Sequence, residues 1–82
     1  LLQYNYFETN LGYEGVYILA NSVNMAGSVL TGNITKHTGT SKSRGVRVQV
    51  NDGIAKNNVS IGFTTNDEYS GTGIIASDNQ DL

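Results

Sequence analysis

Residues 45–64 constrain the fold of this chain more than any other stretch. Valines occupy every second position of residues 46–50, and the alternation returns in residues 59–63 with Val59, Ile61 and Phe63. Successive side chains of a β-strand point to opposite faces, so each run predicts a strand with one apolar face. Residues 51–53, Asn-Asp-Gly, are typical of a tight turn. Together they predict an antiparallel pair of strands.

Further strands are expected in residues 1–9, 15–21, 28–35 and 73–77, from their aromatic, β-branched and alternating residues. No amphipathic helix is predicted. The expected fold is all-β: a small antiparallel β-sandwich, or an open barrel, of about six or seven short strands. Residues 1–82 form a single domain, with a mobile basic loop at 36–45 and an acidic tail at 78–82. Three strands begin after a glycine, which is too faint a similarity to define a repeat.

Composition limits how such a domain is stabilised. The 82 residues include no cysteine, so disulfides and thiolate metal sites are excluded, and no run approaches a membrane span. Charged residues make up 15%, and uncharged polar residues dominate. This favours a secreted, extracellular or surface location, or a place in an assembly. The Leu-Leu start without Met is consistent with a processed chain or an excised piece.

Charge is unevenly distributed along the chain. All five basic residues lie within residues 36–56, while the segments before and after are acidic and the net charge is −2. The basic residues are Lys36, Lys42, Arg44, Arg47 and Lys56. A basic middle and an acidic end attract each other within one chain or between copies.

Catalysis is not expected. His37 is the only histidine, and it lies with Ser41 and Ser43 in the predicted loop, where a nucleophile and its base are poorly aligned. Asp67 and Glu68, with Asn66 and Asp78, offer oxygen ligands for Ca²⁺, but their spacing is not that of a calcium loop. These carboxylates are interpreted as solubilising, and no cofactor or metal is predicted.

The polar and aromatic residues bear on three kinds of binding. The basic loop lacks the aromatic residues that nucleic-acid modules stack on bases, so nucleic acid is an unlikely partner. The five tyrosines suit either a glycan platform or cross-strand and subunit packing. Asn33 and Asn58 each begin an N-glycosylation triplet, at residues 33–35 and 58–60; such matches are expected by chance in a chain rich in Asn, Ser and Thr, and they matter only if the source is eukaryotic.

The first functional hypothesis is a non-enzymatic structural subunit that self-associates into a filament, surface layer or virus-like particle. Edge strands would pair across copies, and the basic middle would meet the acidic end of a neighbour. The predicted subunit contacts are Tyr4, Tyr6, Phe7, Arg44, Arg47, Asp78 and Asp81. The alternatives are a monomeric secreted module that binds a glycan or cell-surface ligand, and a small secreted toxin or bacteriocin.

Overall fold

The structure is a computed structural model that describes residues 1–10, 16–19, 27–41 and 43–82. Within these ranges every regular element is a β-strand, and every strand pair is parallel. The strands are β1 (Leu2–Gln3), β2 (Tyr6–Thr9), β3 (Val16–Leu19), β4 (Val29–Thr31), β5 (Ile34–Ser41), β6 (Val46–Gln49), β7 (Ile54–Lys56), β8 (Val59–Phe63), β9 (Glu68–Ser70), β10 (Ile75–Ser77) and β11 (Gln80–Asp81).

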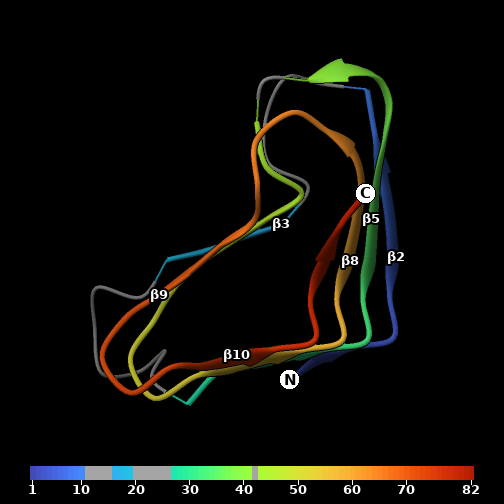
Figure 1. Ribbon diagram of the computed structural model, residues 1–82. Helices are drawn as coiled ribbons and strands as arrows, with labels where there is room; N and C mark the ends of the chain where they lie inside the picture. Colours follow the sequence, from blue (N-terminus) through green and yellow to red (C-terminus); the bar gives the residue numbers. More distant parts are fainter. Residues whose placement is uncertain (11–15, 20–26, 42) are drawn as a thin grey trace.

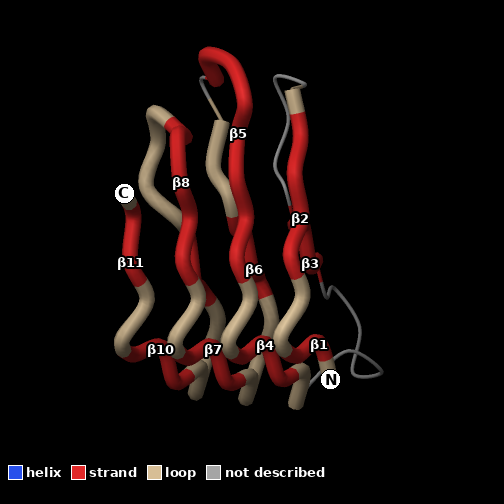
Figure 2. The backbone as a smooth tube through the Cα atoms, turned by 90° about the vertical axis from the view of Figure 1, so that its right-hand side faces the viewer, coloured by secondary structure: helices blue, strands red, loops and turns tan. Residues whose placement is uncertain are grey.

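Successive strands belong to different sheets, so the chain winds as a solenoid of stacked coils (Figure 1, Figure 2). Sheet A has the order β1-β4-β7-β10, sheet B the order β11-β8-β5-β2, and sheet C the order β3-β6-β9. Each full coil adds one strand to each sheet, and the fourth coil adds β10 and β11. Each coil therefore buries its inner face against its neighbours, which is how solenoid repeats are stabilised.

The predicted antiparallel sandwich or open barrel is wrong, because the turn at residues 51–53 joins two different sheets. It leads from β6 in sheet C to β7 in sheet A. Asp52 has the positive φ expected of a tight turn, 54°. Its backbone N–H donates to Thr72 O at 2.9 Å, one coil further along the chain. The turn was located correctly, but its hydrogen-bond partners lie in the next coil rather than in a hairpin.

The alternation predicted for residues 46–50 is confirmed, whereas that of residues 59–61 is reversed and Phe63 packs against the buried His37. All three valines of the first run are buried, in a core completed by Leu30 and Ala55. In β8, however, Ser60 is buried and the apolar residues at 59 and 61 are half-buried on the outer face. Apolar character alone gave the wrong inner face here, because the solenoid interior at this point is a polar network.

Two segments expected to lack regular structure contain strands. β5 continues to Ser41, so it occupies much of the predicted loop at 36–45, and His37 is buried rather than solvated. The predicted tail at 78–82 contains β11. The expected single strand at residues 1–9 is divided into β1 and β2, which lie at the edges of sheets A and B.

Two of the three predicted strands that follow a glycine occupy equivalent positions in successive coils. Val16 pairs with Val46 across sheet C, so residues 16–19 and 46–49 form equivalent strands. Ile75 instead pairs with Ile54 in sheet A, so the third run is not equivalent. The coils differ in length, which hid the repeat from inspection of the sequence.

Candidate functional site

The chain passes from sheet A to sheet B through the same two-residue corner in each of the four coils. We call it the ladder corner; it comprises residues 4–5, 32–33, 57–58 and 78–79. The first residue of each pair has a left-handed backbone, with φ of 55° at Tyr4, 67° at Gly32, 56° at Asn57 and 58° at Asp78. The second residue is always asparagine. A left-handed residue bends the chain sharply, and this bend places the following asparagine in line with those of the neighbouring coils.

The four asparagines form a continuous hydrogen-bonded ladder. The backbone N–H and Nδ2 of Asn33 both donate to Oδ1 of Asn58, at 3.0 Å each. Asn5 donates in the same way to Asn33, and Asn58 to Asn79. These partners are 28, 25 and 21 residues apart along the chain. The inner asparagines are fully buried, so the ladder satisfies polar groups that have no access to water.

The ladder has a direction, and its two ends are chemically different. Each asparagine donates to the next coil and accepts from the previous one. Among the described residues, the backbone N–H of Asn79 has no acceptor and Oδ1 of Asn5 has no donor. One end of the solenoid therefore presents donors, and the other presents an acceptor.

Strand edges are open at the same two ends. β10 and β11 end sheets A and B on one side, and β1 and β2 end them on the other (Figure 2). Ala76 continues the inward row of Leu2, Leu30 and Ala55, yet it is exposed, because no further coil covers it within residues 1–82. Such edges offer unpaired backbone groups to another strand.

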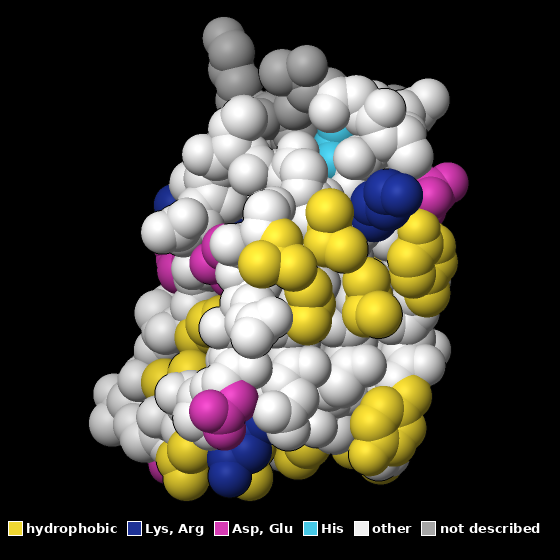
Figure 3. Space-filling model, turned by 45° about the vertical axis from the view of Figure 1, so that its right-hand side comes forward, with side chains coloured by type: hydrophobic (Ala, Val, Ile, Leu, Met, Phe, Trp, Pro, Cys, Tyr) yellow, Lys and Arg dark blue, Asp and Glu magenta, His cyan; other side chains and the backbone are white. Residues whose placement is uncertain are grey.

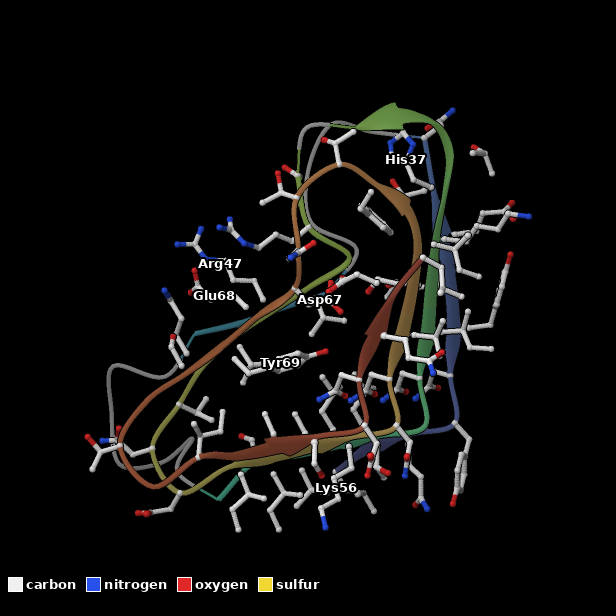
Figure 4. The ribbon with its side chains drawn as sticks, viewed as in Figure 1. His37, Arg47, Lys56, Asp67, Glu68 and Tyr69 are labelled. Carbon is white, nitrogen blue, oxygen red and sulfur yellow. The ribbon has the colours of Figure 1, made fainter. Side chains whose placement is uncertain are left out.

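A chain of polar side chains lies inside the solenoid near the donor end. The hydroxyls of Thr35 and Ser60, both buried, are 2.9 Å apart. Ser60 Oγ donates to Asp67 Oδ2 at 2.7 Å, and Tyr69 OH donates to the same oxygen at 3.0 Å. The backbone N–H of Val46 donates to Asp67 Oδ1. Figure 4 shows Asp67 and Tyr69 directed into the space between the sheets.

Burial sets the ionisation of these two groups. Desolvation raises the pKa of Asp67; hydrogen bonds from Ser60 and Val46 oppose the shift, and the charge of Asp81 adds to it. Desolvation also raises the pKa of Tyr69, and the adjacent Asp67 raises it further. Asp67 is thus a partly buried carboxyl group that holds its proton more tightly than a solvated one does.

Asp81 lies beside Asp67 at the open end. The backbone N–H of Asp67 donates to Asp81 Oδ1 at 3.0 Å. Through the register of sheet B, Asp81 pairs with Ser60, which pairs with Thr35, which pairs with Phe7. Asp81 therefore occupies the inward row of the sheet in the fourth coil, and it is exposed there.

The two arginines predicted as subunit contacts are paired within their own chain. Arg47 Nε lies 3.3 Å from Glu68 Oε2, and Arg44 Nη2 lies 3.8 Å from Glu68 Oε1. Partial desolvation opposes ionisation of Glu68, but hydrogen bonds from Gln49 and Arg47 and the two positive charges outweigh it and lower its pKa. Figure 4 shows Arg47 and Glu68 together outside the coil, on the opposite side of β9 from Tyr69.

The other predicted contact residues fall into two groups. Tyr4 and Asp78 stand at the outside of the ladder corner, and Tyr6 on the outer face of sheet B. Tyr4 and Tyr6 are 76% and 57% exposed. Phe7 and Asp81 are instead at opposite ends of one inward row. The structure thus does not gather the seven residues into one patch.

The described residues contain no group of three or more His, Asp or Glu side chains arranged to hold a metal. Asp67 and Glu68 point to opposite sides of the strand, with the partners described above. His37 packs edge-on against Phe63, with ring centroids 5.5 Å apart, and its Nδ1 accepts the backbone N–H of Gly39 at 2.9 Å. These contacts describe a packed interior histidine.

Sequence reasoning missed the role of the ladder asparagines. Asn33 and Asn58 were noticed only as glycosylation triplets, yet Nδ2 of each donates inside the solenoid, that of Asn58 to Leu30 O at 3.0 Å. A glycan on either nitrogen is incompatible with these bonds. The available signal was a positional one: asparagine follows a turn-forming Gly, Asn or Asp at positions 33, 58 and 79, although at position 5 it follows tyrosine.

The outer surface of sheet B carries apolar side chains with basic and acidic side chains beside them (Figure 3). Its exposed or half-buried members are Tyr6, Ile34, Val59, Ile61, Leu82, Lys36 and Glu8. In the described part of the chain, no helix is long and apolar enough to cross a membrane.

The fold and the ladder place this chain in the structural class of parallel β-solenoids. Comparison with protein-family models, with curated proteins and with solved structures finds no match to it.

Proposed function

We propose that this chain is a non-enzymatic structural module that self-associates by stacking coil on coil, within an extracellular or surface assembly. The observation that carries the proposal is the directional ladder, which ends in donors at Asn79 and in an acceptor at Asn5. Two identical copies placed head to tail bring these complementary groups together. An interface that joins unlike ends leaves a free end on each copy, so it propagates into filaments.

The same head-to-tail stacking also pairs the edge strands of the two copies. β10 of one copy meets β1 of the next in sheet A, and β11 meets β2 in sheet B, with all strands parallel. Ala76 is then covered by Leu2 of the second copy, which extends the inward row of sheet A. Two of the three sheets continue across the junction, and sheet C is interrupted above β9.

In this proposal, assembly depends on strand edges rather than on charge. Arg44 and Arg47 contact Glu68 of their own chain, so they are not required to meet the acidic end of a neighbour. The low content of charged residues and the wealth of Asn, Ser, Thr and Gly support a location in an extracellular or surface assembly, as in the sequence-based hypothesis.

The direct test is the mass of the chain in solution as a function of concentration, with electron microscopy of the same samples. Ala76→Lys places a charge on the inward row of the open end, where a stacked coil would bury it. Ile75→Lys places the same charge on the outer face of the same strand. We expect wild type and Ile75→Lys to form linear assemblies, and Ala76→Lys to remain monomeric.

Three results contradict the proposal. A wild-type chain that stays monomeric at all accessible concentrations rules out self-association. Assembly of Ala76→Lys at the wild-type level rules out stacking through the open coil. Loss of assembly in Ile75→Lys alone would move the interface to the outer face of sheet A.

A second candidate function, glycan binding, is favoured by the exposure of Tyr4 and Tyr6 on adjacent faces of the first coil. The ring of Tyr4 lies over Gly32, where a Cβ would overlap its Cδ1 and Cε1 atoms. Exposed, supported aromatic rings are suited to stacking on apolar faces of other molecules. Titration with soluble polysaccharides, monitored by tyrosine fluorescence, tests this: saturable binding that Tyr4→Ala and Tyr6→Ala abolish supports it, and an unchanged signal excludes it.

A further inference from the structure

The inward row of sheet B changes character at the open end of the solenoid. Its first three members, Phe7, Thr35 and Ser60, are uncharged, and the fourth is Asp81. In the monomer Asp81 is exposed, so its carboxylate is hydrated. Its only described protein partner is the backbone N–H of Asp67. The Asp81 side chain is therefore not desolvated while the end remains open.

Stacking changes this environment. With the ladder continued, Asp81 lies between Ser60 below and Phe7 of the second copy above. The ring replaces water and supplies no hydrogen-bond donor. Enclosing an ionised carboxylate in this way costs far more free energy than enclosing a protonated one, because the neutral acid is less strongly hydrated and its O–H can donate a hydrogen bond. The covered end thus favours the neutral acid.

The groups that face Asp81 do not offset the cost. From β8 it faces Ser60, and from the turn before β9 it faces Asp67, whose own carboxylate accepts the hydroxyls of Ser60 and Tyr69. In the described part of the chain no salt bridge joins a basic side chain to either aspartate. On the outer face, Glu8 of the second copy meets Leu82, where the Glu8 carboxylate remains hydrated.

We propose that stacking is linked to protonation: the Asp81–Asp67 pair takes up a proton when a second copy covers it, so assembly strengthens as the pH falls from neutrality. This inference rests on the proposed function, because it concerns the same junction. Burial of Asp67 supports it, since desolvation and the charge of Asp81 already raise the pKa of Asp67 in the open end.

The experiment measures the dissociation constant for stacking by sedimentation between pH 7.5 and 5, for wild type, Asp81→Asn and Glu8→Gln. Each variant removes one negative charge, so both change the net charge equally, and the amide keeps the Oδ1 acceptor for Asp67 N–H. Proton linkage allows up to about a tenfold change per pH unit for each proton taken up. We expect wild type and Glu8→Gln to tighten at least tenfold over this range. Asp81→Asn should bind as tightly at pH 7.5 as wild type does at pH 5.

The outcomes separate the two proposals. If no protein stacks at any pH, the proposed function itself fails. If wild type stacks with the same dissociation constant at both pH values, stacking stands and the proton linkage is wrong. If Asp81→Asn retains the full pH dependence, Asp81 is not the responsible group. Ala76→Lys should remain monomeric at pH 5; if it associates there, the effect is non-specific association near the isoelectric point.

Discussion

The two corners that flank sheet B are built on opposite principles. The ladder corner repeats one geometry in each of the four coils: a left-handed residue, then asparagine. The variable corner, which joins sheet B to sheet C, differs every time. Equivalent positions across it are eleven residues apart from Tyr6 to Tyr17, thirteen from Ile34 to Arg47 and nine from Val59 to Glu68. The ladder corner therefore has the same backbone geometry in every coil, whereas the variable corner has a different length in each.

The difference shows which part of a solenoid carries stacking and which part tolerates change. A repeated hydrogen bond satisfies each coil through the next, so a defect in the ladder corner affects two junctions. Changes of length at the variable corner are absorbed locally, as in loops generally. Asp67 and Gly45 both lie at the variable corner, so substitution of either residue should disturb only its own contacts and not several coil junctions.

The largest predicted effect is the loss of an inner ladder residue. Asn58→Ala removes the acceptor of the backbone N–H and Nδ2 of Asn33, together with the Nδ2 donor to Leu30 O and Asn79 Oδ1; the backbone N–H of residue 58 still donates to Asn79 Oδ1. Several buried groups lose partners at once, and each costs about 1–3 kcal/mol, so we expect a loss of roughly 3–5 kcal/mol in the free energy of unfolding. Urea denaturation followed by circular dichroism measures it.

Asn66→Ala is the matched control, because it makes the same chemical change in an exposed turn at the variable corner. We expect it to alter stability by no more than about 0.5 kcal/mol. Equal losses in the two variants would mean that the ladder corner is no more important than the variable one.

The next effect tests a close approach beside the variable corner. A Cβ at Gly45 would overlap Ser60 Oγ and Thr35 Oγ1, both in the buried polar chain. Gly45→Ala should therefore cost roughly 1–3 kcal/mol through overpacking. Gly39→Ala, whose Cβ would meet His37 Cε1 at an ordinary 3.4 Å, is the control. Thermal unfolding compares them, and a Gly45→Ala protein as stable as Gly39→Ala would show that the polar chain adjusts freely.

Strand content could be predicted from the sequence, whereas strand pairing could not. Alternation identified the valine strand at residues 46–50, and the apolar run at residues 16–20 was recognised as a strand. Alternation indicates which side chains share a face. It does not indicate whether a strand pairs with the next strand in the sequence or with a strand one full coil away. Coils of 28, 25 and 21 residues also conceal the repeat.

The site was harder to predict than the strands, for a physical reason. Asparagine is ordinarily a turn or surface residue, so Asn33 and Asn58 gave no signal of burial on their own. Only their stacking, one coil apart, satisfies their amides. Tyr4 and Tyr6 were predicted as subunit contacts from their place in an aromatic N-terminal strand, and their exposure is a finding of the structure; the inward placement of Asp81 depends on the parallel register.

A smaller effect concerns pH, measured in the Ala76→Lys background to keep the chain monomeric. Because the pKa of Asp67 is raised by folding, its contribution to stability is fully present below the unfolded value of 3.8 and is lost as the pH rises through the folded value. Asp67→Asn should remove this loss, so its unfolding free energy should fall less between acidic and neutral pH. Urea unfolding at several pH values tests it, and identical profiles for the two proteins would contradict the assignment.

The smallest effect is expected from the half-buried ion pair of Arg47 and Glu68 on the outside of the coil. Glu68→Gln removes the negative charge that pairs with Arg47 and accepts from Gln49. Because salt and water screen this pair, the free energy of unfolding should fall by roughly 0.5 kcal/mol, and by less at high salt. The pKa of Glu68 is lowered by folding, so its stabilisation is present above the unfolded value and is lost as the pH falls through the folded one, opposite in sign to Asp67. Thermal unfolding at low and high salt, with Glu8→Gln as the control, measures the pair. A loss as large as that of Asn58→Ala would show that charge outside the coil, rather than the ladder inside it, holds the coils together.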